Sequence, residues 1–261
     1  MKYKLTLAYD GTAFSGWQIQ PNGISIQELV QKALQTVTRE EILLIGSGRT
    51  DAGVHALCQT AHFSLDAPLN GYRFLNACNA LLPPAIKLLS LDGVSEDFHA
   101  RYSTIGKKYR YCLHLNFVSN PFERAYSWHV PGKCDVERMQ QAIPHFLGTH
   151  DFTSFANEAK TGACSKNPVR SLRRLEIVPL NGGFALEFEG DGFLYKMVRN
   201  IVGTLVDVGR GKIEPAAIPS IILGKNRSLA GRAAPPHGLF LVSAEYPESD
   251  QKTKNEEHFF S

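Results

Sequence analysis

A short glycine-rich segment, residues 46–53, carries the side chains best suited to chemistry. Its three glycines predict a loop with unusual backbone angles, and such a loop can expose a carboxylate at the end of a strand. Arg49 lies two residues before Asp51, and a neighbouring cation favours the charged form of a carboxylate. A charged Asp51 could act as a nucleophile at neutral pH. The residues alone are equally compatible with an aspartate that only orders its own turn.

Hydrophobic periodicity predicts the elements that position this loop. Residues 2–9 alternate polar and apolar side chains, which indicates a half-buried strand. Ser25 and Glu28 form a capping-box pattern at the start of an apolar helical run that reaches Val37. Further strands are predicted at 42–45, 59–65 and 86–91, with a helix at 72–81. The loop with Asp51 therefore follows a strand and precedes another.

The second half of the chain shows a similar alternation with insertions. Strands are predicted at 108–117, 172–179, 184–189 and 239–246. Helices are predicted from Val136 to Leu147, where Pro144 should kink or shorten the helix, and at 193–208. Segregated β-α-β-β-α-β units predict an α+β fold of two ferredoxin-like halves. We expect an N-terminal domain at 1–105 that carries the Asp51 loop, a C-terminal domain at 106–247 and a polar tail at 248–261.

Composition narrows the class of protein. The chain has 261 residues, of which 43% are hydrophobic and 20% charged, as in ordinary globular proteins. The net charge is only +3, so any nucleic-acid surface must be a local basic patch. The five cysteines are widely spaced and form no CxxC pair, which favours reduced thiols in a cytoplasmic protein over a disulfide scaffold or a zinc site. No apolar run predicts a membrane span or a signal peptide.

Six segments together resemble the tRNA pseudouridine synthase A family. The most specific is GRTDAGVHA, which contains Asp51. The others follow the family's order between residues 3 and 247; they are 9–12 with 16–18, 97–101, 107–111, 151–155 and 197–203. The resemblance implies the pseudouridine synthase fold, in which the two halves share a central, mostly antiparallel sheet.

The family's residue roles can be assigned to matching positions in this chain. The resemblance implies that Asp51 is the catalytic aspartate and that Arg199 pairs with it. It also implies that Tyr109 stacks on the target base and is the candidate for proton transfer at uracil C5. Arg49 would help to extrude the target nucleotide and fill the space that it leaves. Without the resemblance, Tyr109 would be interpreted as a core tyrosine, and Arg199 equally as a solvated arginine or as an inward charge near Asp51.

The implied reaction is the isomerisation of uridine to pseudouridine at tRNA positions 38, 39 and 40, in the anticodon stem-loop. A base inside a stem cannot be reached, so the enzyme must flip it out at a cost of a few kcal/mol. Asp51 could attack the ribose at C1′ or uracil at C6, and the sequence does not distinguish these routes. The reaction needs no cofactor and no metal. The resemblance further implies a homodimer that holds tRNA across both subunits.

Several basic residues are candidates for contacts with RNA phosphates. They are Lys107, Lys108 and Arg110, together with Arg170, Arg173 and Arg174. Basic side chains on strands are as often simply solvated. His55 and His62 are seven residues apart with no third ligand nearby, so we interpret them as core or surface histidines and not as a metal site.

Three other functions fit the sequence less well than a synthase. Asp10-Gly11-Thr12 is similar to part of the DxDGT motif of haloacid-dehalogenase-like phosphatases, but Ala8 stands where that motif needs its aspartate nucleophile. A non-catalytic RNA-binding module would also fit a ferredoxin-like sheet. No aromatic RNP-type motif is visible, and the loop around Asp51 would then have no task. A zinc-dependent base deaminase would need the HxE and PCxxC signature, which the chain lacks.

Overall fold

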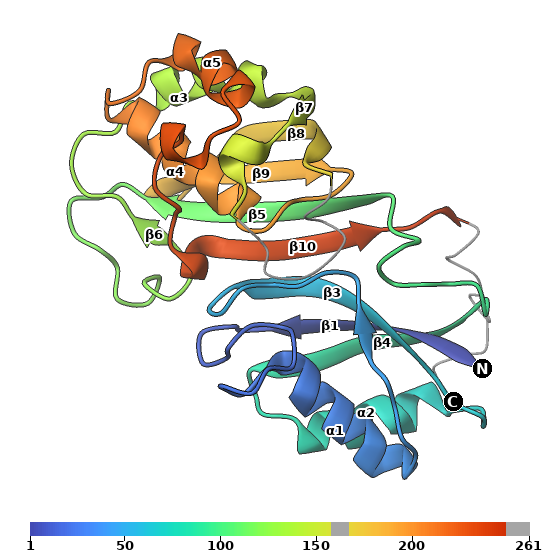
Figure 1. The fold of residues 1–261 in the computed structure, drawn as a ribbon. Coiled ribbons are helices and arrows are strands. Elements are labelled where there is room, and N and C mark those ends of the chain that lie inside the picture. The colour runs from blue at the N-terminus through green and yellow to red at the C-terminus, as the bar shows by residue number, and fades with distance from the viewer. Residues whose placement is uncertain (158–166, 249–261) are drawn as a thin grey trace.

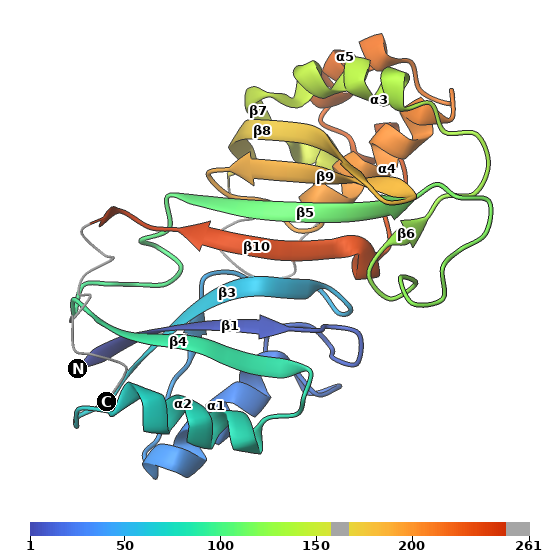
Figure 2. The ribbon, with the colours of Figure 1, turned by 180° about the vertical axis from the view of Figure 1, so that it is seen from behind.

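A computed structural model describes residues 1–157 and 167–248. Within these residues, ten strands form one sheet, and its main path has the order β4-β1-β3-β10-β5-β9-β8-β7. Figures 1 and 2 show this sheet with one group of helices beside its N-terminal half and a second group beside its C-terminal half. The predicted α+β class and its central, mostly antiparallel sheet are confirmed.

The N-terminal half follows the predicted order of elements. It contains β1 (Lys2–Tyr9), α1 (Ile26–Thr38), β2 (Ile45–Gly46), β3 (His55–Ser64), α2 (Gly71–Leu81) and β4 (Ile86–Val94). The Ser25 side chain accepts a hydrogen bond from the backbone N–H of Glu28 and so caps α1. Strand β2 pairs with β3, so the four strands have the order β4-β1-β3-β2, as in a ferredoxin-like unit.

The C-terminal half has the same arrangement with insertions. Its strands are β5 (Gly106–His114), β6 (Trp128–His129), β7 (Gly148–Asp151), β8 (Val169–Leu180), β9 (Gly183–Gly190) and β10 (Leu239–Glu245). Its α-helices are α3 (Val136–Ala142), α4 (Met197–Gly209) and α5 (Ile218–Leu223), and its short 3-10 turns are η1 (Ile143–Phe146), η2 (Thr153–Phe155), η4 (Pro215–Ala217), η5 (Arg227–Leu229) and η6 (Pro236–Gly238). The strands β10-β5-β9-β8 repeat the order of the first half.

The two halves meet where β10 pairs with β3 in parallel. Across this junction, Tyr9 pairs with Ala56, Ala56 with Leu241, and Leu241 with Tyr109. Paired residues on neighbouring strands point to the same side of a sheet. These four side chains therefore form a row on one face, and the apolar residues of α4 belong to the same core cluster as Tyr109. The sheet is continuous through the predicted domain boundary near residue 105, so the division into two domains stays a prediction.

Several predicted boundaries differ from those in the structure; for example, β3 begins at His55, four residues before the predicted start of that strand. Strand β5 ends at His114, and Phe117 is 95% exposed in the following loop. Pro144 shortens α3, which continues as the 3-10 turn η1. Helix α4 begins at Met197 because Lys196 has a positive φ of 60°, which interrupts a helix. The predicted polar tail lies outside the described residues apart from Glu248.

Candidate active site

The chain segment that follows β1 holds the loop between β2 and β3 in place. The Tyr9 hydroxyl shares a hydrogen bond of 2.8 Å with the Thr50 hydroxyl. The backbone N–H of Trp17 donates to the Thr50 carbonyl at 3.1 Å. Gly16 has a φ of +92°, and a Cβ there would lie 2.6 Å from the Thr50 carbonyl oxygen. The backbone next to Asp51 is therefore fixed by segments 9–12 and 16–18. The family resemblance included both segments but implied no role for them.

Asp51 forms an ion pair with Arg199, as the sequence resemblance implied. The Nη1 atom of Arg199 lies 2.6 Å from Oδ2 of Asp51, although 148 residues separate the two in the chain. The Nε atom of Arg199 donates to the Ala234 carbonyl at 2.7 Å, which orients the guanidinium. The side chains are 11% and 22% exposed for Arg199 and Asp51. Among the described residues, no hydrogen bond holds Oδ1 of Asp51, so one carboxylate oxygen is anchored and the other is available.

Tyr109 lies close enough to Asp51 for the carboxylate charge to affect the pKa of its hydroxyl. Burial raises the pKa of the Tyr109 hydroxyl, and the charges of Tyr9 and Asp51 raise it further. The ring is 9% exposed and packs edge-on against Phe193, with the centroids 5.0 Å apart. A raised pKa keeps this hydroxyl protonated at neutral pH.

Arg49 is exposed beside the same loop. Its Nε donates to the side-chain oxygen of Gln18 at 3.2 Å, and Gln18 belongs to the segment that also holds Thr50. Asp51, Arg199 and Tyr109 are therefore brought together by tertiary structure, with Arg49 at the solvent-exposed edge of the group.

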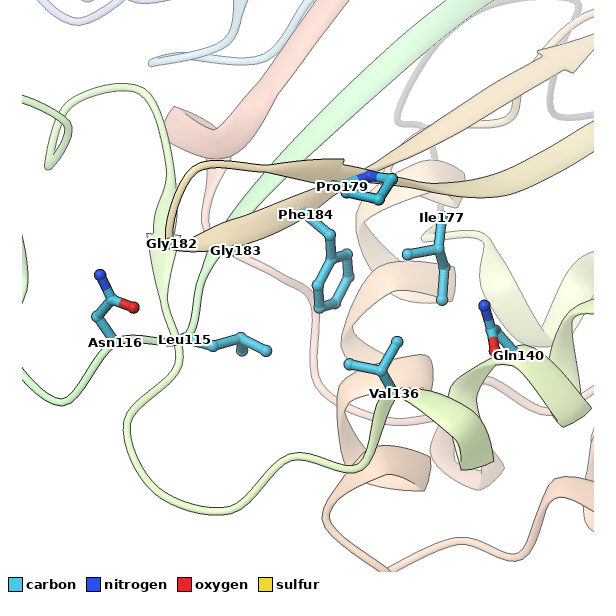
Figure 3. A pocket seen from close by; sticks show the side chains of 9 residues that line it. All are labelled: Leu115, Asn116, Val136, Gln140, Ile177, Pro179, Gly182, Gly183 and Phe184. Carbon is cyan, nitrogen blue, oxygen red and sulfur yellow. The ribbon is translucent and has the colours of Figure 1, made fainter.

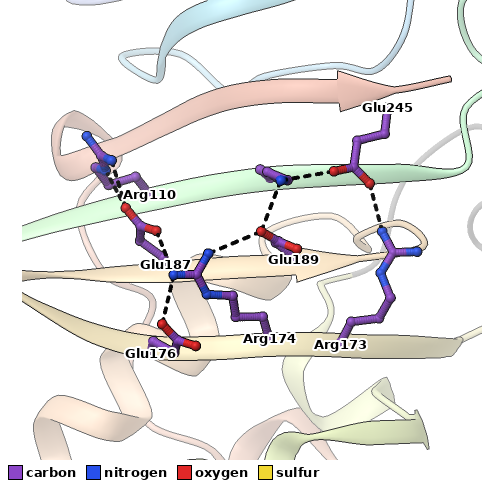
Figure 4. Close-up of polar contacts among 8 residues, drawn as sticks. Arg110, Arg173, Arg174, Glu176, Glu187, Glu189 and Glu245 are labelled. Carbon is purple, nitrogen blue, oxygen red and sulfur yellow. Dashed lines mark hydrogen bonds and ion pairs between the residues drawn. The ribbon is translucent and has the colours of Figure 1, made fainter.

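The other predicted basic residues divide between the two faces of the sheet. Side chains alternate along β5, so Lys107 shares the face of Tyr109 while Lys108 and Arg110 point to the opposite face. On that face, arginine and lysine side chains from β5 and β8 alternate with glutamates from β8, β9 and β10 (Figure 4). The ion pairs measure 2.7–3.4 Å and join Lys108, Arg110, Arg173, Arg174, Glu176, Glu187, Glu189 and Glu245.

This network changes how the basic residues are interpreted. Lys108 and Arg110 lie on the side of the sheet away from Asp51, and carboxylates already partner them. Hydrogen bonds to Glu245 and Glu189 raise the pKa of Lys108. Arg170 donates to the backbone carbonyls of Asn167 and Val169 and is also outside the group around Asp51. Of the six basic candidates, Lys107 is the one that the structure places at the Asp51 loop, where it donates to the Ser47 carbonyl.

Sequence reasoning missed two residues that organise the site. Gln59 is fully buried; it donates to the Gly48 carbonyl at 3.0 Å and accepts from the Ser47 hydroxyl at 2.7 Å. Its signal in the sequence was a neutral polar residue at the start of a predicted strand. Ala234 holds Arg199 through a backbone carbonyl, which leaves no signal in the residue type.

One hollow in the described part of the chain lies away from this group. It is lined by Leu115, Val136 and Phe184, with Gly182 and Pro179 at the end of the β8–β9 hairpin (Figure 3). Its lining contains no charged side chain, so it does not suit a nucleic acid. The described residues contain no cluster of three or more His, Cys, Asp or Glu side chains that could hold a metal. None of their helices is long and apolar enough to cross a membrane.

A family model described as tRNA pseudouridine synthase matches residues 6–103 and 142–247. The tRNA pseudouridine synthase A 1 of Protochlamydia amoebophila is 56% identical over 245 residues, which cover 94% of this chain and 96% of that protein. The tRNA pseudouridine synthase A of Bacillus licheniformis is 44% identical over 243 residues, with coverage of 92% and 97%. Among solved structures, a chain from a crystal structure of a Cbf5-Nop10-Gar1 complex is 12% identical with a TM-score of 0.37, and the match covers 92% of this chain and 57% of that chain. This likeness is too low to support an argument about the fold or the function.

Proposed function

Because the chain belongs to the tRNA pseudouridine synthase family, we propose that it isomerises uridine at positions 38, 39 and 40 of the tRNA anticodon stem-loop, with Asp51 as the nucleophile. The family membership confirms the resemblance seen in the sequence and identifies the chain as an isomerase. The observation that carries the proposed mechanism is the ion pair between Asp51 and Arg199, which holds one carboxylate oxygen and leaves the other available.

The reaction sets clear demands on Asp51. The N1–C1′ bond of uridine breaks, a C5–C1′ bond forms, the C5 proton leaves and N1 gains a proton. Whether the carboxylate attacks C1′ or C6, it must be charged and must keep a free oxygen. Arg199 donates to Oδ2 and stabilises the charge, which leaves Oδ1 for the reaction. The guanidinium is itself oriented by the Ala234 carbonyl, so the carboxylate is held before substrate arrives.

The target base must leave its helical stack before Asp51 can reach it. Flipping costs a few kcal/mol, and stacking on an aromatic ring or a guanidinium offsets part of that cost. Arg49 is exposed beside Asp51, and we assign it to the space that the base vacates. Tyr109 lies close enough for the Asp51 charge to affect its hydroxyl, and we assign its ring to the flipped uracil.

The Tyr109 hydroxyl has a second possible task, the removal of the C5 proton. Its raised pKa means that it is protonated in the free enzyme, so it must first lose its own proton before it can accept another. Tyr109→Phe keeps the ring and removes the hydroxyl. A variant with normal tRNA affinity and a much slower isomerisation would assign the hydroxyl to proton transfer, whereas a nearly normal rate would limit Tyr109 to stacking.

Pseudouridine mapping of tRNA after incubation with the purified protein tests the proposed function. We expect modification at positions 38, 39 and 40 by the wild type and none by Asp51→Asn. The tRNA affinity of that variant should stay within about tenfold of wild type, a change of about 1.4 kcal/mol or less. Asp66→Asn removes an exposed carboxylate elsewhere on the protein and serves as the control. Unchanged activity in Asp51→Asn would rule out the mechanism, and tRNA binding without modification by the wild type would indicate a non-catalytic RNA-binding protein.

We also propose that the protein acts in the cytoplasm as a homodimer that holds one tRNA across both subunits. Both statements rest on the family membership. Sedimentation of the purified protein, alone and with tRNA, tests the dimer, and a monomer in both conditions would contradict it.

A further inference from the structure

Lys107 connects the C-terminal half to the loop that precedes Asp51. It lies on β5 two residues before Tyr109, so both side chains point to the same face of the sheet. Its ammonium group donates a hydrogen bond of 2.7 Å to the backbone carbonyl of Ser47. A hydrogen bond from a charged donor is among the stronger kinds in proteins.

The close approach of Lys107 depends on Gly48. A Cβ at this position would lie 2.6 Å from Nζ of Lys107, so a side chain on residue 48 would displace the ammonium group. Gly48 does not have a positive φ. Glycine at this position therefore leaves room for the Lys107 side chain and is not required by an unusual backbone angle.

The N-terminal half holds the same short stretch of backbone from the other side. The backbone N–H of Ser47 donates to the Thr60 carbonyl at 2.7 Å, and its hydroxyl donates to Gln59 at 2.7 Å. Gln59 also holds the Gly48 carbonyl. Ser47 is thus the residue of the loop that is hydrogen-bonded both to β3 of the N-terminal half and to β5 of the C-terminal half.

We propose that Lys107 is a positioning residue, whose hydrogen bond to Ser47 sets the place of Asp51 relative to Tyr109. This inference rests on the proposed function. Lys107 and Tyr109 belong to one strand, about 7 Å apart along it, and Ser47 precedes Asp51 by four residues. The bond therefore ties the loop of the nucleophile to the strand that carries the stacking ring. Arg199 holds the other end of the loop at Asp51.

The positioning role differs from the phosphate contact that the sequence suggested for Lys107, and the two predict different kinetics. A phosphate contact contributes to affinity and to its salt dependence. A positioning residue acts on the chemical step, where a displacement of about 1 Å can cost about 100-fold in rate. The comparison needs the single-turnover rate constant at saturating protein and the tRNA dissociation constant at several salt concentrations.

Lys107→Met removes the ammonium group and keeps most of the aliphatic stem. We expect its single-turnover rate constant to fall about 10- to 100-fold, with a dissociation constant within about threefold of wild type and an unchanged salt slope. Lys4→Met is the matched control, because Lys4 is a partly buried lysine on the opposite face of the sheet, paired with Asp92. It should match wild type in both measurements.

Gly48→Ala provides a second test that keeps the charge of Lys107. The added methyl group displaces the ammonium group from Ser47, so the rate loss should match that of Lys107→Met. The double variant should then lose no more than either single variant, because both changes break the same bond. Circular dichroism and thermal melting of each variant establish that it is folded, and Gly48→Ala replaces Lys107→Met if the latter is not.

Two results would overturn the positioning role. One is a weaker affinity in Lys107→Met with a salt slope reduced by about one and a normal rate at saturation, which identifies a phosphate contact. The other is additive rate losses in the double variant. Failure of the proposed function is separate from both, since it appears as a wild-type protein that forms no pseudouridine.

Discussion

The ion pair between Asp51 and Arg199 should stabilise the fold as well as serve the reaction. Arg199→Met would leave the Asp51 carboxylate and the Ala234 carbonyl without their donor. Removal of one partner from a fully buried ion pair costs roughly 3–5 kcal/mol. Because the Asp51 side chain is 22% exposed, water can replace part of the lost contact. We therefore expect a loss of about 2 kcal/mol in the free energy of unfolding.

Arg199→Lys separates the charge from the geometry. Arginine donates to Asp51 through Nη1 and to Ala234 through Nε, and a lysine has a single nitrogen that cannot occupy both places. This variant should lose about 1 kcal/mol, the net value of one ordinary hydrogen bond. It should also isomerise uridine more slowly than wild type, because the carboxylate is held less firmly.

A double-mutant cycle isolates the energy of the pair. The variants are Arg199→Met, Asp51→Ala and their combination, each unfolded in urea and followed by both fluorescence and circular dichroism. Trp17 and Trp128 report on different halves of the chain, so coincident transitions justify a two-state analysis. We expect a coupling energy of about 1–2 kcal/mol. Single-variant effects that add to within about 0.5 kcal/mol would refute a stabilising pair.

Three further predictions concern pH, backbone and RNA. Burial, with the charges of His99 and Lys2, lowers the pKa of His62 to about 4. The folded protein should therefore lose stability as the pH falls from about 6.5 to 4. In urea unfolding, His62→Gln should remove at most about 3 kcal/mol of this loss. A His62→Gln variant with the same pH dependence as wild type would contradict this assignment. Gly16→Ala should lower the free energy of unfolding by about 1–3 kcal/mol because of its positive φ and the nearby Thr50 carbonyl, and a variant as stable as wild type in thermal melting would show that the loop adapts. Arg110→Ala should leave the salt slope of tRNA binding unchanged, since Glu187 partners Arg110 on the far face; a slope lower by about one would place RNA there.

Local features of the sequence were enough to predict most elements and the loop with Asp51. Strand β1 and helix α1 follow from periodicities of two and about 3.6 residues, and Ser25 caps α1 as its pattern indicates. These features depend on residues that are close in the chain, and so does the glycine-rich turn. Where an unusual backbone conformation intervened, as at Lys196, the predicted helix boundary was wrong by several residues.

Tertiary structure alone decided which of the candidate residues meet. The resemblance implied the pairing of Asp51 with Arg199, but only the fold brings them within 2.6 Å of each other. The same β5 pattern suggested Lys107, Lys108 and Arg110 equally, yet strand alternation places Lys107 at the loop and the other two on the far face. Alternation along β5 already puts Lys107 on the face of Tyr109, but its contact with Ser47 depends on the pairing of strands that are distant in sequence.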